Sequence, residues 1–168
     1  MQDIIIGNIL SFGSACFTMA ANWTVSKRKS YMFQFWQCLI LAVANYFFHS
    51  YAGITTLILC AVRNYIIGKG KYTKNWCIFF MIAIGVIGLV INNRGIPGIL
   101  LCLATVLYTW GSFICERPMA VKTNILINQI CWGIYEGFVL DFVSLITEII
   151  TASVLIVSMV KIRGDRAE

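Results

Sequence analysis

A polar and aromatic stripe runs along residues 124–136, in sequence that is otherwise mainly apolar. Its members follow one another largely at steps of three and four residues, which places them on one side of a helix: Asn124, Asn128, Gln129, Trp132, Tyr135 and Glu136. Amides beside an indole face suit a neutral polar ligand with a flat or ring-shaped surface. The alternative is hydrogen bonding between helices, worth about 0.6 kcal/mol per contact in membranes. We favour binding, because so many polar groups on one helix exceed the needs of packing.

Glu148 is a second polar residue in apolar surroundings. It lies near the middle of the last apolar run, between Leu145-Ile146-Thr147 and Ile149-Ile150. An ionised carboxylate is costly at that depth in a bilayer, so the side chain must face a cavity, find a partner or stay protonated. Two interpretations stay open. The carboxyl contacts a substrate or coupling proton, or it is a neutral group bonded to an adjacent helix.

A weaker counterpart of the stripe occupies residues 34–45, with Gln34, Trp36, Gln37 and Asn45. The predicted substrate-binding residues are therefore Asn128, Gln129, Trp132, Glu148, Gln37, Trp36, Asn45 and Asn124. Arg63 stands near the end of an apolar run, and we expect it to extend its charge to the lipid headgroups. Tyr108 is expected to be a packing or interfacial aromatic residue.

The sequence contains no catalytic constellation. H-E-x-x-H, G-x-S-x-G and Walker motifs are absent, and the single histidine, His49, cannot pair with a buried nucleophile. The seven cysteines form no C-x-x-C pair and lie mostly in apolar runs, as small packing residues in reduced form do. We therefore expect no enzyme, no metal and no cofactor.

The composition is that of a chain whose solvent is mostly lipid. Of 168 residues, 60% are apolar or aromatic and 12% are charged, against roughly 45–50% and about 25% in soluble domains. The net charge of +6 could suggest nucleic acid. However, the basic residues form short clusters between apolar runs, which indicates membrane topology. We expect membrane lipid as a partner, and no nucleic acid.

Seven apolar runs are candidates for membrane spans, which need roughly 17–25 residues. They are Ile4–Val25, Tyr31–Phe48, Ala52–Ile67, Trp76–Ile91, Ile96–Cys115, Met119–Phe138 and Val139–Val160. The third run is short and the sixth is unusually polar, so these two are the least secure. The predicted fold class is all-α integral membrane with seven transmembrane helices.

The placement of basic residues supports this helix count. With seven crossings, twelve of the thirteen Lys and Arg residues fall on or near one face: Lys27, Arg28, Lys29, Arg63, Lys69, Lys71, Lys74, Arg117, Lys122, Lys161, Arg163 and Arg166. Only Arg94 falls on the other face. The positive-inside rule places the basic face in the cytoplasm. The N-terminus is then outside and the C-terminus is cytoplasmic.

An odd helix count permits two three-helix units of the same orientation, with one helix between them. A shift of 91 positions aligns the two halves without a gap, for example Gly7 with Gly98 and Phe47 with Phe138, and sets Gln37 opposite Asn128. The number of identical pairs is close to what two apolar segments give by chance. The prediction of a repeat therefore depends mainly on helix order and charge. The predicted units are a first bundle (1–70), a linker helix (71–95) and a second bundle with a short cytoplasmic tail (96–168).

Three stretches make the chain similar to a known group. They are Asn22-Trp23 ahead of Lys27-Arg28-Lys29, the stretch Tyr46-Phe47-Phe48-His49-Ser50-Tyr51-Ala52-Gly53, and Thr55-Thr56-Leu57 running on to Val62-Arg63-Asn64. The layout resembles the superfamily of SWEET sugar transporters, PnuC-type vitamin transporters and KDEL receptors, also called PQ-loop or MtN3-like proteins. Within it, the chain most resembles the YgjV-type bacterial inner-membrane proteins.

The resemblance implies two parallel three-helix bundles joined by a linker helix, the 3-1-3 SWEET-like arrangement, with a substrate path between them. The proline hinge of the first helix in the sugar transporters is missing here. We expect a multi-pass inner-membrane transporter, a facilitator or ion-coupled, for a small polar metabolite such as a sugar, nucleoside or vitamin. The alternative is a non-transporting receptor or partner-binding protein of the same fold. A homo-oligomer stays open.

Overall fold

Seven α-helices account for nearly all of the protein that the structure describes. The computed structural model describes residues 2–23, 27–115 and 118–164. Its helices are α1 (Gln2–Trp23), α2 (Lys27–Phe47), α3 (Tyr51–Gly68), α4 (Lys74–Val90), α5 (Ile96–Ile114), α6 (Pro118–Val139) and α7 (Phe142–Gly164). The prediction of seven helices is confirmed, and no predicted end differs from the observed one by more than four residues.

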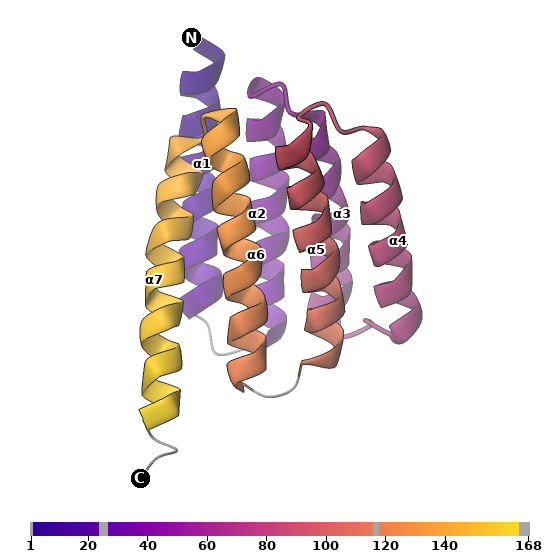
Figure 1. Cartoon of the computed structure of the whole chain (residues 1–168), viewed down its shortest axis with the longest axis vertical. Helices are drawn as coiled ribbons and strands as arrows, with labels where there is room; N and C mark the ends of the chain where they lie inside the picture. The colour runs from indigo at the N-terminus through magenta and orange to yellow at the C-terminus, as the bar shows by residue number, and fades with distance from the viewer. Residues whose placement is uncertain (1, 24–26, 116–117, 165–168) are drawn as a thin grey trace.

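The helices stand side by side in two layers (Figure 1). One layer is α1–α2–α3 and the other is α7–α6–α5, with neighbours in each layer packed along their length. The layers meet at their edges, where α1 packs on α7 and α3 packs on α5. Helix α4 stands outside this ring and contacts only α3 and α5 among the described helices. The ring therefore encloses a central space lined by six helices.

The two ends of the bundle differ in charge. One end holds the C-terminal side of α7 together with the α3–α4 turn, and carries Lys69, Lys71 and Lys74. The first turns of α2 and α6 reach the same end and add Arg28, Lys29 and Lys122. We call it the basic end; Arg117 and Arg166 lie outside the described residues. The other end, called the opposite end, holds the N-terminal side of α1 and the α2–α3, α4–α5 and α6–α7 turns, with Arg94.

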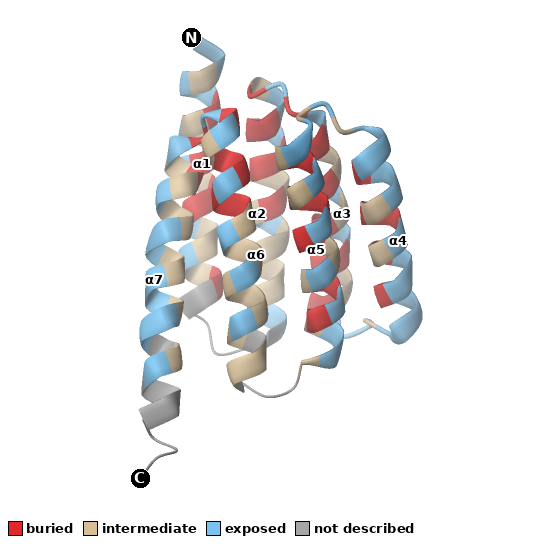
Figure 2. Cartoon of the chain, viewed as in Figure 1, coloured by how far each residue is buried: buried red, intermediate tan, exposed pale blue. Residues whose placement is uncertain are grey.

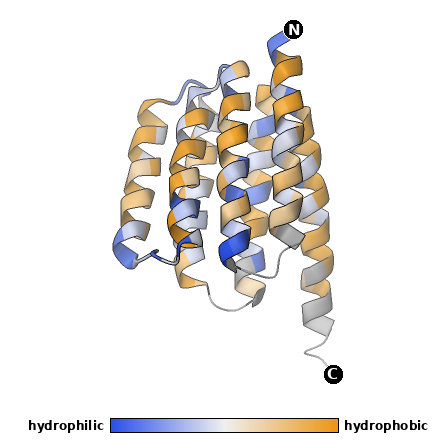
Figure 3. Ribbon diagram, turned by 180° about the vertical axis from the view of Figure 1, so that it is seen from behind, coloured by the Kyte–Doolittle hydropathy of each residue, from blue (hydrophilic) through white to orange (hydrophobic). Residues whose placement is uncertain are grey.

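The outer surface is strongly apolar. Ile9, Val90 and Ile96 expose 66%, 79% and 82% of their surface, and apolar colour covers most of the outward helix faces (Figure 3). Buried residues gather on the inward faces (Figure 2). Exposed apolar surface on this scale marks contact with a membrane or a partner rather than water.

Among the described residues, three helical stretches are long and apolar enough to cross a membrane: Gln2–Ala21, Tyr51–Gly68 and Ile96–Ile114. Lys74–Val90 and Phe142–Val157 are apolar but shorter. Helices α2 and α6 carry the amides and charges noted above, which lower their hydropathy. The least apolar helices are thus the middle helices of the two layers.

Local capping residues set the helix starts at the opposite end. The Ser50 hydroxyl accepts a hydrogen bond from the Gly53 N–H at 3.3 Å and caps α3. The Asp141 carboxylate accepts one from the Ser144 N–H at 3.0 Å and caps α7. Pro97 stands in the first turn of α5, where its missing N–H costs nothing.

Equivalent features recur 91 positions apart. Helices α2 and α6 start at residues 27 and 118, α3 and α7 start at 51 and 142, and α1 and α5 end at 23 and 114. Before α3, the Ser50 N–H donates to the Asn45 carbonyl; before α7, the Asp141 N–H donates to the Glu136 carbonyl. Both pairs of residues are separated by the same 91 positions, so the two turns have the same backbone geometry.

Candidate functional site

A cavity of about 120 Å³ lies between the two layers. Residues of α1, α2, α3, α5, α6 and α7 line it, so every helix of the ring contributes. Its polar side chains are Gln34, Gln37, Arg63, Asn64, Asn128, Gln129, Glu136 and Glu148, with Thr18, Thr105 and Tyr108. Ligand pockets for drug-sized molecules measure about 300–1,000 Å³, so this one suits a small metabolite.

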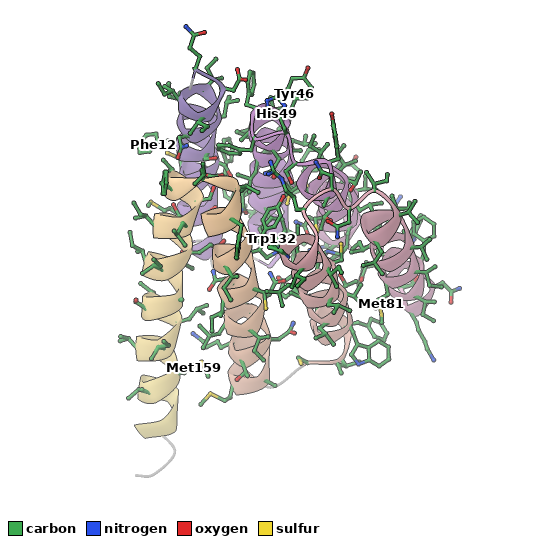
Figure 4. The ribbon with its side chains drawn as sticks, turned by 45° about the horizontal axis from the view of Figure 1, so that its top comes forward. Phe12, Tyr46, His49, Met81, Trp132 and Met159 are labelled. Carbon is green, nitrogen blue, oxygen red and sulfur yellow. The ribbon has the colours of Figure 1, made fainter. Side chains whose placement is uncertain are left out.

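Helix α6 supplies one wall of the cavity. Asn128, Gln129, Trp132 and Glu136 line it at helical spacing, as the stripe in the sequence predicts. Trp132 is only 7% exposed and lies toward the middle of the bundle in Figure 4. The side-chain carbonyl oxygens of Asn128 and Gln129 are buried and have no hydrogen-bond partner among the described residues. Such oxygens are costly when left alone, and a bound solute or water would satisfy them.

Two carboxyl groups share the part of the cavity nearer the opposite end. Glu136 is 2% exposed, and neither of its carboxyl oxygens has a hydrogen-bond partner among the described residues. One carboxyl oxygen of Glu148 is likewise buried and has no hydrogen-bond partner among the described residues. A hollow of about 10 Å³, roughly the space for one water, adjoins both groups and is lined by Ser11 and Ser14 of α1. The pair can therefore receive a cation, a proton or a hydrogen-bond donor.

Arg63 faces the cavity from α3, so its expected position at the headgroups was wrong. The side chain is 3% exposed. Its Nη1 donates to the Thr109 hydroxyl at 2.6 Å, and Nε and Nη2 donate to Asn64 Oδ1 at 3.3 and 3.1 Å. The guanidinium also lies 5.1 Å from the centre of the Tyr108 ring. These partners are neutral, so they orient the charge without cancelling it.

The spacing along α3 explains why Arg63 points inward. Thr56, Cys60, Arg63 and Asn64 are buried and follow one another at four, seven and eight residues from the first, which is one helix face. Small and polar residues at these steps were the signal that could have assigned Arg63 and Asn64 to the site. Proximity to the end of an apolar run is a weaker guide than the face on which a residue lies.

A hydrogen-bond cluster closes the opposite end of the bundle. The Tyr135 hydroxyl donates to Asn45 Oδ1 at 3.1 Å and is hydrogen-bonded to the Ser50 hydroxyl. Tyr135, Asn45 and Ser50 expose 2% of their surface or less. A Cβ added at Gly53 would come within 3 Å of both Asn45 and Tyr135. The layers therefore meet closely here, through groups of α2, α3 and α6.

The basic end is hollowed instead. A second cavity of about 260 Å³ lies there between α2, α3 and α5. Its lining includes Arg28 and Tyr31 at the start of α2, Tyr72 of the α3–α4 turn, and Ser112 of α5. The two ends of the ring thus differ in packing as well as in charge.

Five of the eight predicted binding residues meet in the central cavity: Gln37, Asn128, Gln129, Trp132 and Glu148. The other three lie elsewhere. Asn45 belongs to the closing cluster, and Trp36 is 50% exposed and packs on Phe35 with a ring separation of 5.1 Å. The Asn124 amide donates to the Tyr108 carbonyl at 3.2 Å and packs on α5.

Comparison with known proteins gives one match. A family model described as a bacterial inner membrane protein, Imp-YgjV, matches residues 5–166. No curated protein and no solved structure matches the chain. Because the matched residues cover almost the whole sequence and all seven helices, the chain belongs to the Imp-YgjV family of bacterial inner membrane proteins.

Proposed function

We propose that this protein carries a small polar metabolite across the bacterial inner membrane and binds it in the central cavity. The observation that carries the proposal is a set of buried side-chain oxygens that have no hydrogen-bond partner among the described residues. They belong to Asn128, Gln129, Glu136 and Glu148, all of which line that cavity. Polar groups inside a membrane protein are expensive and commonly mark a substrate or ion pathway. A solute that supplies donors to these oxygens would remove that cost.

A duplicated three-helix unit provides the machinery for transport. Support comes from helix ends and capped turns that recur at an offset of 91, and from the position of α4 outside the ring. In this proposal residues 1–70 and 96–168 form two parallel bundles and residues 71–95 form the linker, as in the 3-1-3 SWEET-like plan. Transporters built of such repeats place the substrate between them near the bilayer midplane.

The packing and charge of the two ends indicate which side of the membrane the bundle is open to in this conformation. The positive-inside rule assigns the basic end to the cytoplasm and the opposite end to the outside. Tyr135, Asn45 and Ser50 then seal the outer side, while the 260 Å³ cavity lies on the cytoplasmic side. We infer a conformation that faces inward, and rocking of one bundle against the other would break the outer cluster and close the inner cavity.

Uptake into proteoliposomes tests this proposal. The purified chain is reconstituted and supplied with labelled sugars, nucleosides, vitamins and amino acids, singly. Saturable uptake of at least one solute is expected, reduced at least tenfold in Asn128→Ala. The matched control is Asn75→Ala, because Asn75 is an exposed residue of α4. Absence of saturable uptake or binding for every solute, or equal loss in both variants, would overturn the proposal. A stoichiometric partner co-purifying with a chain that binds no solute would instead favour the receptor interpretation.

A further inference from the structure

The charges around the cavity are of both signs and lie at different heights. Arg63 lines it from α3, and Glu136 and Glu148 line it from α6 and α7. Helices α3 and α7 start at the same end, at residues 51 and 142. With a rise of 1.5 Å per residue, Arg63 lies about 18 Å below that end and Glu148 about 9 Å below it. Glu136, close to the end of α6, lies about 5 Å below it.

Each charged group is prepared for an external partner. The neutral contacts of Arg63 with Thr109, Asn64 and the Tyr108 ring hold its guanidinium in place, and each of its two Nη atoms carries a second N–H that can donate to a carboxylate. Toward the opposite end, both carboxyl oxygens of Glu136 and one of Glu148 are buried and have no hydrogen-bond partner within the part of the chain that the structure describes. Trp132, one helical turn from Glu136, can add cation–π attraction for an ammonium group.

We propose that the solute is a small zwitterion, an amino acid or short ω-amino acid, bound with its carboxylate toward Arg63 and its ammonium toward Glu136 and Glu148. This inference rests on the proposed function and names the substrate class for that site. The two backbone levels of Arg63 and Glu148 differ by about 9 Å, and the long arginine side chain shortens the gap between the charges. The cavity of about 120 Å³ limits the solute to a short chain.

Solutes of other charge match the cavity less well. A neutral sugar could bond to the amides of Asn128 and Gln129 but would leave the cation and both carboxyls facing an uncharged ligand. An anion is repelled by the carboxyls, and a simple cation leaves Arg63 without a counter-charge. A zwitterion gives each charged group a complementary partner, which is the basis of discrimination between solutes.

The test measures thermal unfolding of the purified full chain with probes of one chain length and different charge. 4-Aminobutyrate carries both charges, butyrate only the anion, and n-butylamine only the cation; glycine and β-alanine are shorter zwitterions, and glucose is a neutral control. At least one zwitterion is expected to raise the unfolding temperature in a saturable manner, because a ligand that binds only the folded state stabilises it. Butyrate and n-butylamine should require at least tenfold higher concentrations.

Variants locate the effect in the cavity. Arg63→Gln and Glu136→Gln should each abolish the zwitterion response, and Lys69→Gln, which removes an exposed charge at the basic end, should leave it unchanged. Selectivity among the probes is measured on the unaltered chain, so it holds even if a cavity variant fails to fold.

Three results would overturn the inference by itself. The first is n-butylamine acting as strongly as every zwitterion, and the second is a zwitterion response that persists in Arg63→Gln. The third is Asn128-dependent binding of glucose or a nucleoside with no zwitterion response, which would leave the proposed transport function standing. If no probe and no solute of the uptake panel binds, both proposals fail together.

Discussion

The hydroxyl of Tyr135 in α6 donates to the side-chain oxygen of Asn45 in α2 at 3.1 Å, across the interface between the two helical layers. Both residues are buried and belong to the cluster that closes the opposite end, and Ser50, also buried, completes it. Within the described interface, this is the one hydrogen-bonded group that joins buried polar side chains of α2, α6 and the cap of α3. The strength of this cluster should set how readily that end opens.

Removing the Tyr135 hydroxyl should weaken the closed end. Tyr135→Phe keeps the ring but deprives Asn45 and Ser50 of a partner, at a cost of about 1–3 kcal/mol in the free energy of unfolding. The same change should lower solute affinity measured from the basic side, because it favours opening at the other end. Chemical denaturation and uptake measure the two effects. Tyr46→Phe is the control, since Tyr46 is 64% exposed; equal behaviour of the two variants would contradict the role given to the cluster.

Gly53 tests how closely the layers must approach. An added Cβ would come within 3 Å of the Asn45 and Tyr135 side chains, both of which are held by hydrogen bonds. Gly53→Ala should therefore destabilise the fold by about 1–3 kcal/mol through overpacking. At Gly85 the nearest atom would be 3.9 Å away, so Gly85→Ala should be neutral or slightly stabilising. The unfolding temperatures of the two variants are compared directly. A lower unfolding temperature for Gly85→Ala than for Gly53→Ala would refute the argument.

Asn128 and Asn124 should separate binding from packing on the same helix. The Asn128 side-chain oxygen has no hydrogen-bond partner among the described residues, whereas the Asn124 amide donates to the Tyr108 carbonyl. Asn128→Ala should abolish solute binding and change the free energy of unfolding by less than about 0.5 kcal/mol. Asn124→Ala should lower that free energy by about 1 kcal/mol and leave solute affinity within about threefold. Titration of solute against each variant, paired with denaturation, distinguishes these outcomes.

Asp141 should give the stability of the α6–α7 turn a pH dependence. Burial raises the pKa of Asp141 above its ordinary value, and hydrogen bonds from Ser11 and Ser144 offset only part of that rise. The carboxyl therefore contributes most to stability below about pH 4, where it is protonated in both states, and this contribution falls as the pH rises through the folded-state pKa. Asp141→Asn still accepts from the Ser144 N–H, its amide N–H can donate to the Ser11 hydroxyl in place of the bond that Ser11 donates, and it has no charge to titrate.

The measurement is the free energy of unfolding of both proteins between pH 4 and 8. The free energy of unfolding of the unaltered chain minus that of Asp141→Asn should decrease as the pH rises, and then level off. Asp141→Ala, which removes the α7 cap and the partner of Ser11, should be less stable than Asp141→Asn by about 1–2 kcal/mol at every pH. A difference between the first two proteins that grows with pH would show that the pKa is lowered instead.

The helices could be predicted from the sequence because lipid demands long apolar runs with basic residues at their ends. The prediction of an inner-membrane family of the YgjV type is confirmed by the family match, and its place among SWEET-like transporters stays a prediction. The polar stripe on α6 could also be predicted from the sequence, because a single helix fixes the relative positions of Asn128, Gln129 and Trp132.

Positions that depend on rotation of one helix against another were harder to predict. Trp36 adjoins Gln37 in sequence, yet the two point to different sides of α2, and only packing against α1 and α3 decides which faces inward. Arg63 was misplaced for the same reason, because its distance from the helix end does not reveal its face. Asn45 was predicted to bind substrate, but it accepts a hydrogen bond from Tyr135, and that bond joins residues 90 positions apart.

The two matched turns carry different side chains at equivalent positions. Asn45 and Glu136 hold the same place in their turns, each lending its carbonyl to the residue that caps the next helix. One half thus presents an amide where the other presents an acid, although the surrounding backbone is alike. A solute bound between the two halves could not exchange its two ends by rotation without losing favourable contacts. In the proposed transport, the solute would therefore cross with the same end leading each time, and movement in the reverse direction would begin with its other end.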